Sequence, residues 1–526
     1  MPVLGACMRI HLLAAAALTV TAPAQANWYR ASSQHFVIYS EQKPQNLHHF
    51  ATQLELFDQA VRLAHGMQDQ PRSKGNRVTI FDVGAAKVQQ LIHDESGMIE
   101  GFYHGNVEGS VAFVSRSNPM DFQVRTGDLL PRVNIAEFRP DTVLLHEYSH
   151  HLMMQDLARP YPQWLVEGWA EFMSATQFND DGSVDIGIEA PYRYMNLEYG
   201  DQVPLETMFS GHFDKMTNEQ MASLYSRAWL LTHYLTFEPS RKGQLDAYVA
   251  ALAKGVDPLQ AARQAFGDLT DLQHDLDKYA GRSKRTGLHI PAKDFKQVSI
   301  DVSPLTAGGS AVLPLLMRVR SPAEQDPKDL AREVEKVEQQ YRGDPLVETT
   351  LAEADIDSKD YKAAQAAANR ALAADPRSTD AMILEGRAIV KELADSKGSA
   401  SDFDNARTWF LKANKIDPED PEPLYRFYES FVQEKIAPTA NAISALHYAS
   451  DLAPQDLGVR VESASQYLAD GDVKDARAAL VPVAYDPHGE EIAKRARTMI
   501  DKIDAGDTKA ALAAAIAPEA SKTKTN

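Results

Sequence analysis

The order of hydrophobic and polar residues divides the chain into a mixed first half and a helical second half. Residues 35–39 (HFVIY), 77–81 (RVTIF) and 109–115 (GSVAFVS) carry the β-branched and aromatic side chains that are typical of strands. Residues 46–64 instead have apolar side chains at helical spacing. We therefore expect one α+β unit over residues 27–285.

The second half is rich in alanine, and its helical segments end repeatedly at a proline. These prolines lie 42, 36 and 33 residues apart, at Pro376, Pro418, Pro454 and Pro487. The spacing is close to the period of about 34 residues that tetratricopeptide helix pairs show. Residues 326–503 therefore resemble a short, irregular tetratricopeptide array with a concave surface for a partner. The alternative interpretation is a generic α-helical bundle whose helices happen to end in Asp-Pro.

Three further segments complete the predicted organisation. Residues 286–325 read as a linker or small β segment, and residues 504–526 as a flexible tail. Residues 1–26 resemble a secretory signal, with Arg9, a short apolar run and a small-residue cleavage pattern. Since no other stretch reaches the ~20 apolar residues of a membrane helix, we expect a periplasmic or secreted bacterial protein without a membrane span.

Composition narrows the function further. The formal net charge of −19 argues against nucleic-acid binding, which normally needs a basic surface. The single cysteine, Cys7, lies within the predicted signal. The remaining chain therefore has neither a disulfide nor a thiol nucleophile.

Residues 146–150 carry the candidate chemistry. His146-Glu147-Tyr148-Ser149-His150 is an H-E-x-x-H pattern inside an apolar, helical stretch. Residues four apart lie on one face of a helix, so His146 and His150 can both direct a ring nitrogen at one metal ion. Glu147 follows His146 directly and is placed to accept a proton from a water on that ion. The pattern alone is only moderately specific, and a third ligand is required.

The second apolar helix supplies that ligand. Glu167 comes 17 residues after His150, within the segment WLVEGWAEF. A site of two histidines and one glutamate would hold a catalytic Zn²⁺, one per chain, with the fourth position open. Glu171 lies one turn further on the same face, where it can orient a ligating histidine. The alternative is a solvated pair of carboxylates on a helix face.

These motifs resemble the gluzincin metallopeptidases, which combine H-E-x-x-H with a glutamate on the following helix. Residues 164–172 are similar to the W-L-N-E-G-F-A element of aminopeptidase-N-like enzymes, which share a thermolysin-like catalytic core. The E-G-x-A-E element and the helical region behind it resemble the bacterial peptidase-MA-like proteins more closely. The resemblance implies an α+β zincin-like metallopeptidase domain, followed by an all-α tetratricopeptide-like domain.

The same resemblance points to a residue that stabilises the oxyanion. In aminopeptidase-N-like enzymes a tyrosine in a similar helix start hydrogen-bonds the developing oxyanion, which by resemblance makes Tyr225 the candidate here. His233 and Tyr234 are the fallback candidates. No G-A-M-E-N-like element precedes the motif, which makes exopeptidase activity doubtful and leaves the choice between internal and terminal cleavage open.

The expected function is zinc-dependent hydrolysis of peptide bonds, with the helical repeats recruiting a substrate or a protein partner. The alternative is an inert scaffold of the same shape that has lost catalysis and binds a partner through its repeats. Zinc stoichiometry and turnover, with Glu147→Gln as the control, discriminate between the two.

Overall fold

The structure is a computed structural model. It describes residues 28–69, 73–92, 101–115, 141–156, 161–188, 193, 196–197, 200, 203–211, 213, 216–282, 285–321, 325–486 and 490–516. The predicted signal, residues 1–26, lies outside the described residues. Residues 508–516 of the predicted tail form a helix, α22 (Thr508–Ile516).

A mixed six-stranded sheet forms the first half, in the order β4-β5-β3-β2-β1-β9. Strands β2, β3 and β5 run parallel, while β4 and β9 close the two edges as antiparallel partners of β5 and β1. The strands predicted at residues 35–39, 77–81 and 109–115 are confirmed within two residues at either end. The six strands are β1 (Tyr29–Ser32), β2 (Phe36–Ser40), β3 (Val78–Val83), β4 (Gly101–His104), β5 (Val111–Ser115) and β9 (Asp301–Pro304).

Both faces of this sheet are covered by helices. On one face, Phe36 and Ile38 alternate inward from β2 and pack in a core with Leu54 and Phe57 of α1 (Pro44–His65). On the other face, the aromatic side chains of β3 and β5 pack with α2 (Ala85–Ile92) and α11 (Ala307–Val319). The predicted helix at residues 46–64 is thus confirmed as α1.

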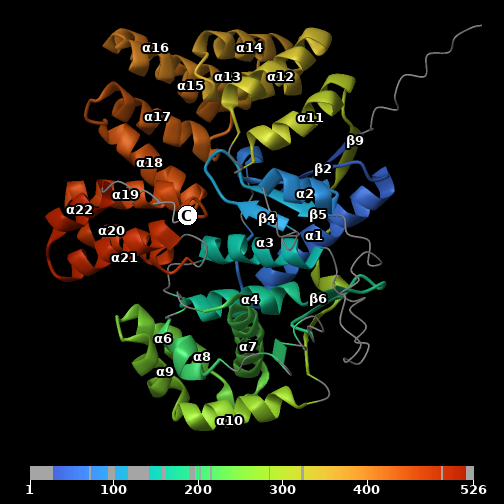
Figure 1. Ribbon diagram of the computed structural model, residues 1–526, viewed down its shortest axis with the longest axis vertical. Helices are drawn as coiled ribbons and strands as arrows, with labels where there is room; N and C mark the ends of the chain where they lie inside the picture. The colour runs from blue at the N-terminus through green and yellow to red at the C-terminus, as the bar shows by residue number, and fades with distance from the viewer. Residues whose placement is uncertain are drawn as a thin grey trace, which may run out of the picture.

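Below the sheet lie the two helices that carry the H-E-x-x-H and E-G-x-A-E motifs (Figure 1). They are α3 (Asp141–Asp156) and α4 (Gln163–Ser174), and α4 packs on α7 (Asn218–Phe237). A small sheet of β6 (Thr176–Phe178), β7 (Val184–Ile186) and β8 (Leu288–Ile290) flanks them. The other helices of this part are α6 (Leu205–Ser210), α8 (Gln244–Ala253), α9 (Pro258–Phe266) and α10 (Leu269–Ala280).

A curved array of antiparallel helices forms the second half. Consecutive helices pack on one another, and the array bends around one side of the six-stranded sheet, from α12 at the top of the view to α21 and α22 at the left (Figure 1). Its helices are α12 (Pro327–Tyr341), α13 (Pro345–Asp357), α14 (Tyr361–Ala374), α15 (Thr379–Ser396), α16 (Ala400–Ile416), α17 (Pro421–Glu434), α18 (Ala440–Leu452), α19 (Leu457–Asp470), α20 (Val473–Ala484), α21 (Glu490–Asp504) and α22.

The predicted fold class, a separate α+β zincin-like domain followed by a repeat domain, is wrong. The described chain is mostly helical, and its two halves are not separate. Strand β9 completes the sheet at β1, and α11 packs both on the sheet and on α12 and α13. Leu457 of α19 also packs against Met153 and Met154 of α3. Local periodicity cannot reveal the pairing of β9 with β1 or the contact of Leu457 with α3, because each joins segments that are hundreds of residues apart.

Among the described residues, no helix has both the length and the apolar character needed to cross a membrane.

Candidate functional site

Helices α3 and α4 bring together the three predicted metal ligands. The Nε2 atoms of His146 and His150 lie 3.1 Å apart, and Glu167 Oε2 lies 3.2 Å from the first and 3.6 Å from the second. Two ligand atoms of a tetrahedral Zn²⁺ lie about 3.3 Å apart, given bonds of about 2.0 to 2.1 Å. The donor set and its spacing therefore fit a zinc ion.

Helix geometry explains why these side chains converge. Leu144, Leu145 and Leu152 bury one side of α3 in the core, which leaves the histidines, four residues apart, together on the side that faces α4. Pro162 precedes α4, whose residues are almost all buried. Glu167 therefore sits in the interior, where its carboxylate requires a neighbouring positive charge.

The electrostatics of the cluster show the same requirement. Burial opposes protonation of His146, but its contacts with Glu167 and Glu171 prevail and raise its pKa to about 10. Burial would raise the pKa of Glu167, yet the two histidines hold it well below the usual range. A metal ion held by the two Nε2 atoms and Glu167 would balance the buried Glu167 carboxylate as a proton on a histidine does.

Glu171 lies against His146 on the side away from Glu167, and its predicted role in orienting that histidine stays a prediction. Its Oε1 lies 3.3 Å from His146 Nδ1, and Arg193 donates to both of its carboxylate oxygens. Burial would raise the pKa of Glu171, but the charges and hydrogen bonds of Arg193 and His146 together outweigh it and lower the pKa to about 2. Sequence reasoning missed Arg193, because it lies 22 residues beyond Glu171 in no recognisable motif.

Tyr225 and Glu147 both lie near the cluster. The guanidinium of Arg193 sits 5.9 Å from the centre of the Tyr225 ring. Burial raises the pKa of Tyr225, and the charges of Glu167, Glu171 and Glu147 raise it further. Its phenol thus stays protonated and able to donate a hydrogen bond. The roles of these two residues stay predictions.

The fallback candidates belong to the core around Tyr279. His233 Nδ1 lies 2.7 Å from the Tyr279 hydroxyl, and aromatic rings surround the imidazole. The Tyr234 hydroxyl accepts a hydrogen bond from Arg241 Nε at 3.2 Å. These contacts give both residues a structural role.

The burial of His233 leads to a prediction for stability against pH. Its side chain is 0% exposed, and burial, with the nearby charge of Arg285, lowers its pKa to about 4. The unfolded chain, in which histidine has a pKa of about 6.5, binds this proton more readily. The contribution to the free energy of unfolding, roughly 3 kcal/mol, is therefore complete above pH 6.5 and is lost as the pH falls towards 4.

Urea unfolding of the wild type and His233→Gln between pH 7 and pH 4 measures this contribution. We expect the wild type to lose more stability than the variant over that range, since the other titrating groups are common to both. Parallel curves would contradict the assignment.

The charges of a second group of potential metal ligands are already balanced by ion pairs within the protein. His35, Asp58 and Asp69 also have ligand atoms within 4.8 Å of one another. However, Arg62 Nε donates to Asp58 at 2.7 Å, and His35 Nδ1 lies 2.8 Å from Glu55. These ion pairs account for the charges, so this group is structural.

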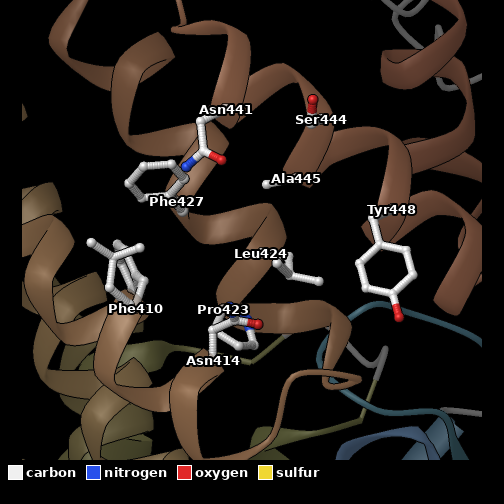
Figure 2. Close-up of a pocket in the computed structure, with 10 residues that line it drawn as sticks. Phe410, Asn414, Pro423, Leu424, Phe427, Asn441, Ser444, Ala445 and Tyr448 are labelled. Atoms are coloured by element: carbon white, nitrogen blue, oxygen red, sulfur yellow. The ribbon is translucent and has the colours of Figure 1, made fainter.

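The helical array carries a groove between α16, α17 and α18 (Figure 2). Its volume is about 290 Å³. Leu411 and Tyr448 line it with 47% and 44% of their surfaces exposed. Amide and hydroxyl groups stand among these apolar side chains. The lining residues are Phe410, Leu411, Asn414, Pro423, Leu424, Phe427, Asn441, Ser444, Ala445 and Tyr448.

Comparison with known proteins gives neighbours only among solved structures. No protein-family model matches the chain, and no curated protein matches it. A thermophilic TPR protein of Thermus thermophilus, TTC0263, matches 32% of this chain and 89% of its own length, at 16% identity and a TM-score of 0.28. Yeast Tom70 matches 72% of this chain and 76% of its own, at 14% identity and a TM-score of 0.26.

These neighbours correct the family assignment. They are tetratricopeptide-repeat proteins, and the predicted place among gluzincin, peptidase-MA-like metalloproteases is wrong. At such low TM-scores the likeness carries no argument about function. The short motifs misled because H-E-x-x-H and E-G-x-A-E describe two helix faces and leave the rest of the fold undetermined. The part of the prediction that is supported is the tetratricopeptide-like helical array of the second half.

Proposed function

We propose that this protein is a scaffold that recruits a protein partner through its tetratricopeptide-like helical array. The groove between α16, α17 and α18 carries the proposal, because the large apolar side chains of Leu411 and Tyr448 stay exposed side by side with its amide and hydroxyl groups. Stacked helix pairs of this kind create extended concave surfaces suited to binding a chain segment.

The groove fits a peptide segment with an apolar anchor. Leu411, Leu424 and Tyr448 offer a pocket for an aliphatic or aromatic side chain. Asn414 Oδ1 is buried and has no hydrogen-bond partner among the described residues. Asn441 carries a second amide at the opposite end of the groove (Figure 2). A peptide backbone presents the N–H and C=O groups that such amides pair with.

A library of synthetic peptides tests this assignment. We expect the wild type to bind a subset with apolar anchors, and the double variant Leu411→Glu/Tyr448→Ser to bind them about 30-fold more weakly, the effect of losing a hot-spot contact. Leu63→Glu is the matched control, because Leu63 is 50% exposed on α1, outside the groove. Equal binding by the wild type and the double variant, or no binding by either, would contradict the proposal.

A second candidate function is zinc-dependent hydrolysis of peptide bonds at His146, His150 and Glu167. The convergence of these three ligand atoms favours it. Zinc, when bound, activates water and polarises a carbonyl. Glu147 would accept the proton of the attacking water and pass it to the leaving amine. Tyr225 would donate a hydrogen bond to the developing oxyanion, and Glu171 would hold His146 in place through Nδ1.

Purified protein loaded with zinc and incubated with a mixed peptide library tests this second function. Chelator-sensitive cleavage supports it, whereas one tightly bound zinc without cleavage would leave the scaffold as the only function that is supported.

We also propose a periplasmic or secreted location in a bacterium, which rests on the signal-like residues 1–26.

A further inference from the structure

The turn between β4 and β5 inserts into the helical array. Val107 at its tip is 4% exposed and packs in a cluster with Tyr428, Phe431 and Leu446 of α17 and α18. Its backbone N–H donates to Asp456 Oδ2 at 2.8 Å. The array thus holds this turn with buried apolar surface and a charge-assisted hydrogen bond.

Charge strengthens the same contact. Glu108 follows Val107 and forms ion pairs with Arg426 and with Arg387, the latter at 3.3 Å. Both arginine side chains are buried, with exposures of 8% and 11%, so each requires a nearby carboxylate. Because Gly105 lies against Gln455, a Cβ there would be 2.7 Å from Gln455 Cγ. The turn therefore fits the array closely.

The two strands that leave the turn reach helix α3. The Tyr103 hydroxyl on β4 lies 2.7 Å from His151 Nδ1 and donates to Ser110 Oγ at 3.1 Å. Ser110 in turn accepts a hydrogen bond from Gln455 Nε2 of the array at 3.2 Å. His151 is the residue after His150, so a continuous set of hydrogen bonds joins the array to the helix of the metal ligands.

We propose that Tyr103 is a positioning residue for His146 and His150, and that the helical array keeps Tyr103 in place through the β4–β5 turn. This inference rests on the zinc site proposed above. It makes the array part of the architecture of the metal centre, in addition to its role in binding a partner. Because the same groups hold α3, zinc binding is expected to stabilise the turn in return.

Tyr103→Phe tests the positioning role by removing one hydroxyl and keeping the ring. We expect the affinity for Zn²⁺, measured by competition with a chromophoric chelator, to fall about 10-fold, the lower end for groups that orient a ligand. Tyr361→Phe is the matched control, because its hydroxyl bonds Asp395 at 3.0 Å on the array, away from the turn. Its zinc affinity is expected to equal that of the wild type.

Hydrogen exchange supplies a second readout that a purely structural role would not move. Zinc added to the wild type is expected to slow amide exchange in α3 and also in residues 105–110, and Tyr103→Phe is expected to lose the second effect. An unchanged zinc affinity of Tyr103→Phe, or wild-type protection confined to α3 and α4, overturns the positioning role alone. A wild type that binds no zinc overturns the metal site itself, and this inference with it.

Discussion

Glu167→Gln is expected to lower the affinity of the protein for Zn²⁺ by more than about 100-fold. Loss of a ligand should exceed the 10- to 100-fold effect of a group that only orients one. The substitution keeps the shape of the side chain but removes the negative charge that faces the two histidine Nε2 atoms at 3.2 and 3.6 Å. Titration with Zn²⁺ against a competing chelator measures the effect.

Glu147→Gln separates metal binding from chemistry. Since Glu147 is not among the three converging ligands, this variant should hold Zn²⁺ as tightly as the wild type and lose any peptide hydrolysis. Glu206→Gln serves as the control for both, because that side chain is 62% exposed on α6. Wild-type zinc affinity in Glu167→Gln would show that the metal site is wrongly assigned, and wild-type turnover in Glu147→Gln would refute the proposed proton transfer.

Gly168→Ala is expected to destabilise the protein by about 3 kcal/mol, the upper range for overpacking. A Cβ at Gly168 would lie 2.5 Å from the carbonyl oxygen of Ala228 and 2.5 Å from Thr232 Oγ1. The backbone of α7 cannot give way as a flexible side chain would, so α4 must shift. Glu167 and Glu171 lie on α4, and the shift should therefore also weaken zinc binding.

Urea unfolding and zinc titration of Gly168→Ala measure these two effects. Gly281→Ala is the matched control, because the nearest atom to its added Cβ is the carbonyl oxygen of Lys278 at 3.6 Å, an ordinary contact. We expect Gly281→Ala to behave as the wild type. If Gly168→Ala were equally stable, α4 and α7 would have to pack further apart than the structure has them.

Hydrophobic periodicity predicted individual strands and helices of the first half, but it did not predict how they pair and pack. The strands around Phe36, Val78 and Val111 and the long helix α1 follow from local alternation of apolar side chains. The pairing of β9 with β1 does not follow from such alternation, since residues 301–304 contain only two apolar side chains, Val302 and Pro304. The division into two separate domains failed for this reason.

The candidate site shows the same limit. His146, His150, Glu167 and Glu171 are neighbours through helix spacing and one helix–helix contact, which sequence can suggest. Arg193 contacts Glu171 from 22 residues further along the chain, and Tyr103 contacts His151, next to the site, from an edge strand; neither stands in a motif. The gluzincin assignment went further than the motifs allowed, because it inferred a whole fold from two helix faces.

The pairing of β1 with β9 bears on how the chain acquires its structure. During synthesis β1 can pair with β2 early, but its second neighbour is about 270 residues away and is made only after the whole α3–α10 region. Until then β1 presents an open edge of N–H and C=O groups, which is a template for pairing with another chain. Such distant pairing is also slow to form. Self-association should therefore be most severe in nascent or refolding chains that end before residue 301. The arrival of β9 should reduce it, because this new edge strand carries a charge at Asp301 and a proline at Pro304, which discourage pairing with another chain.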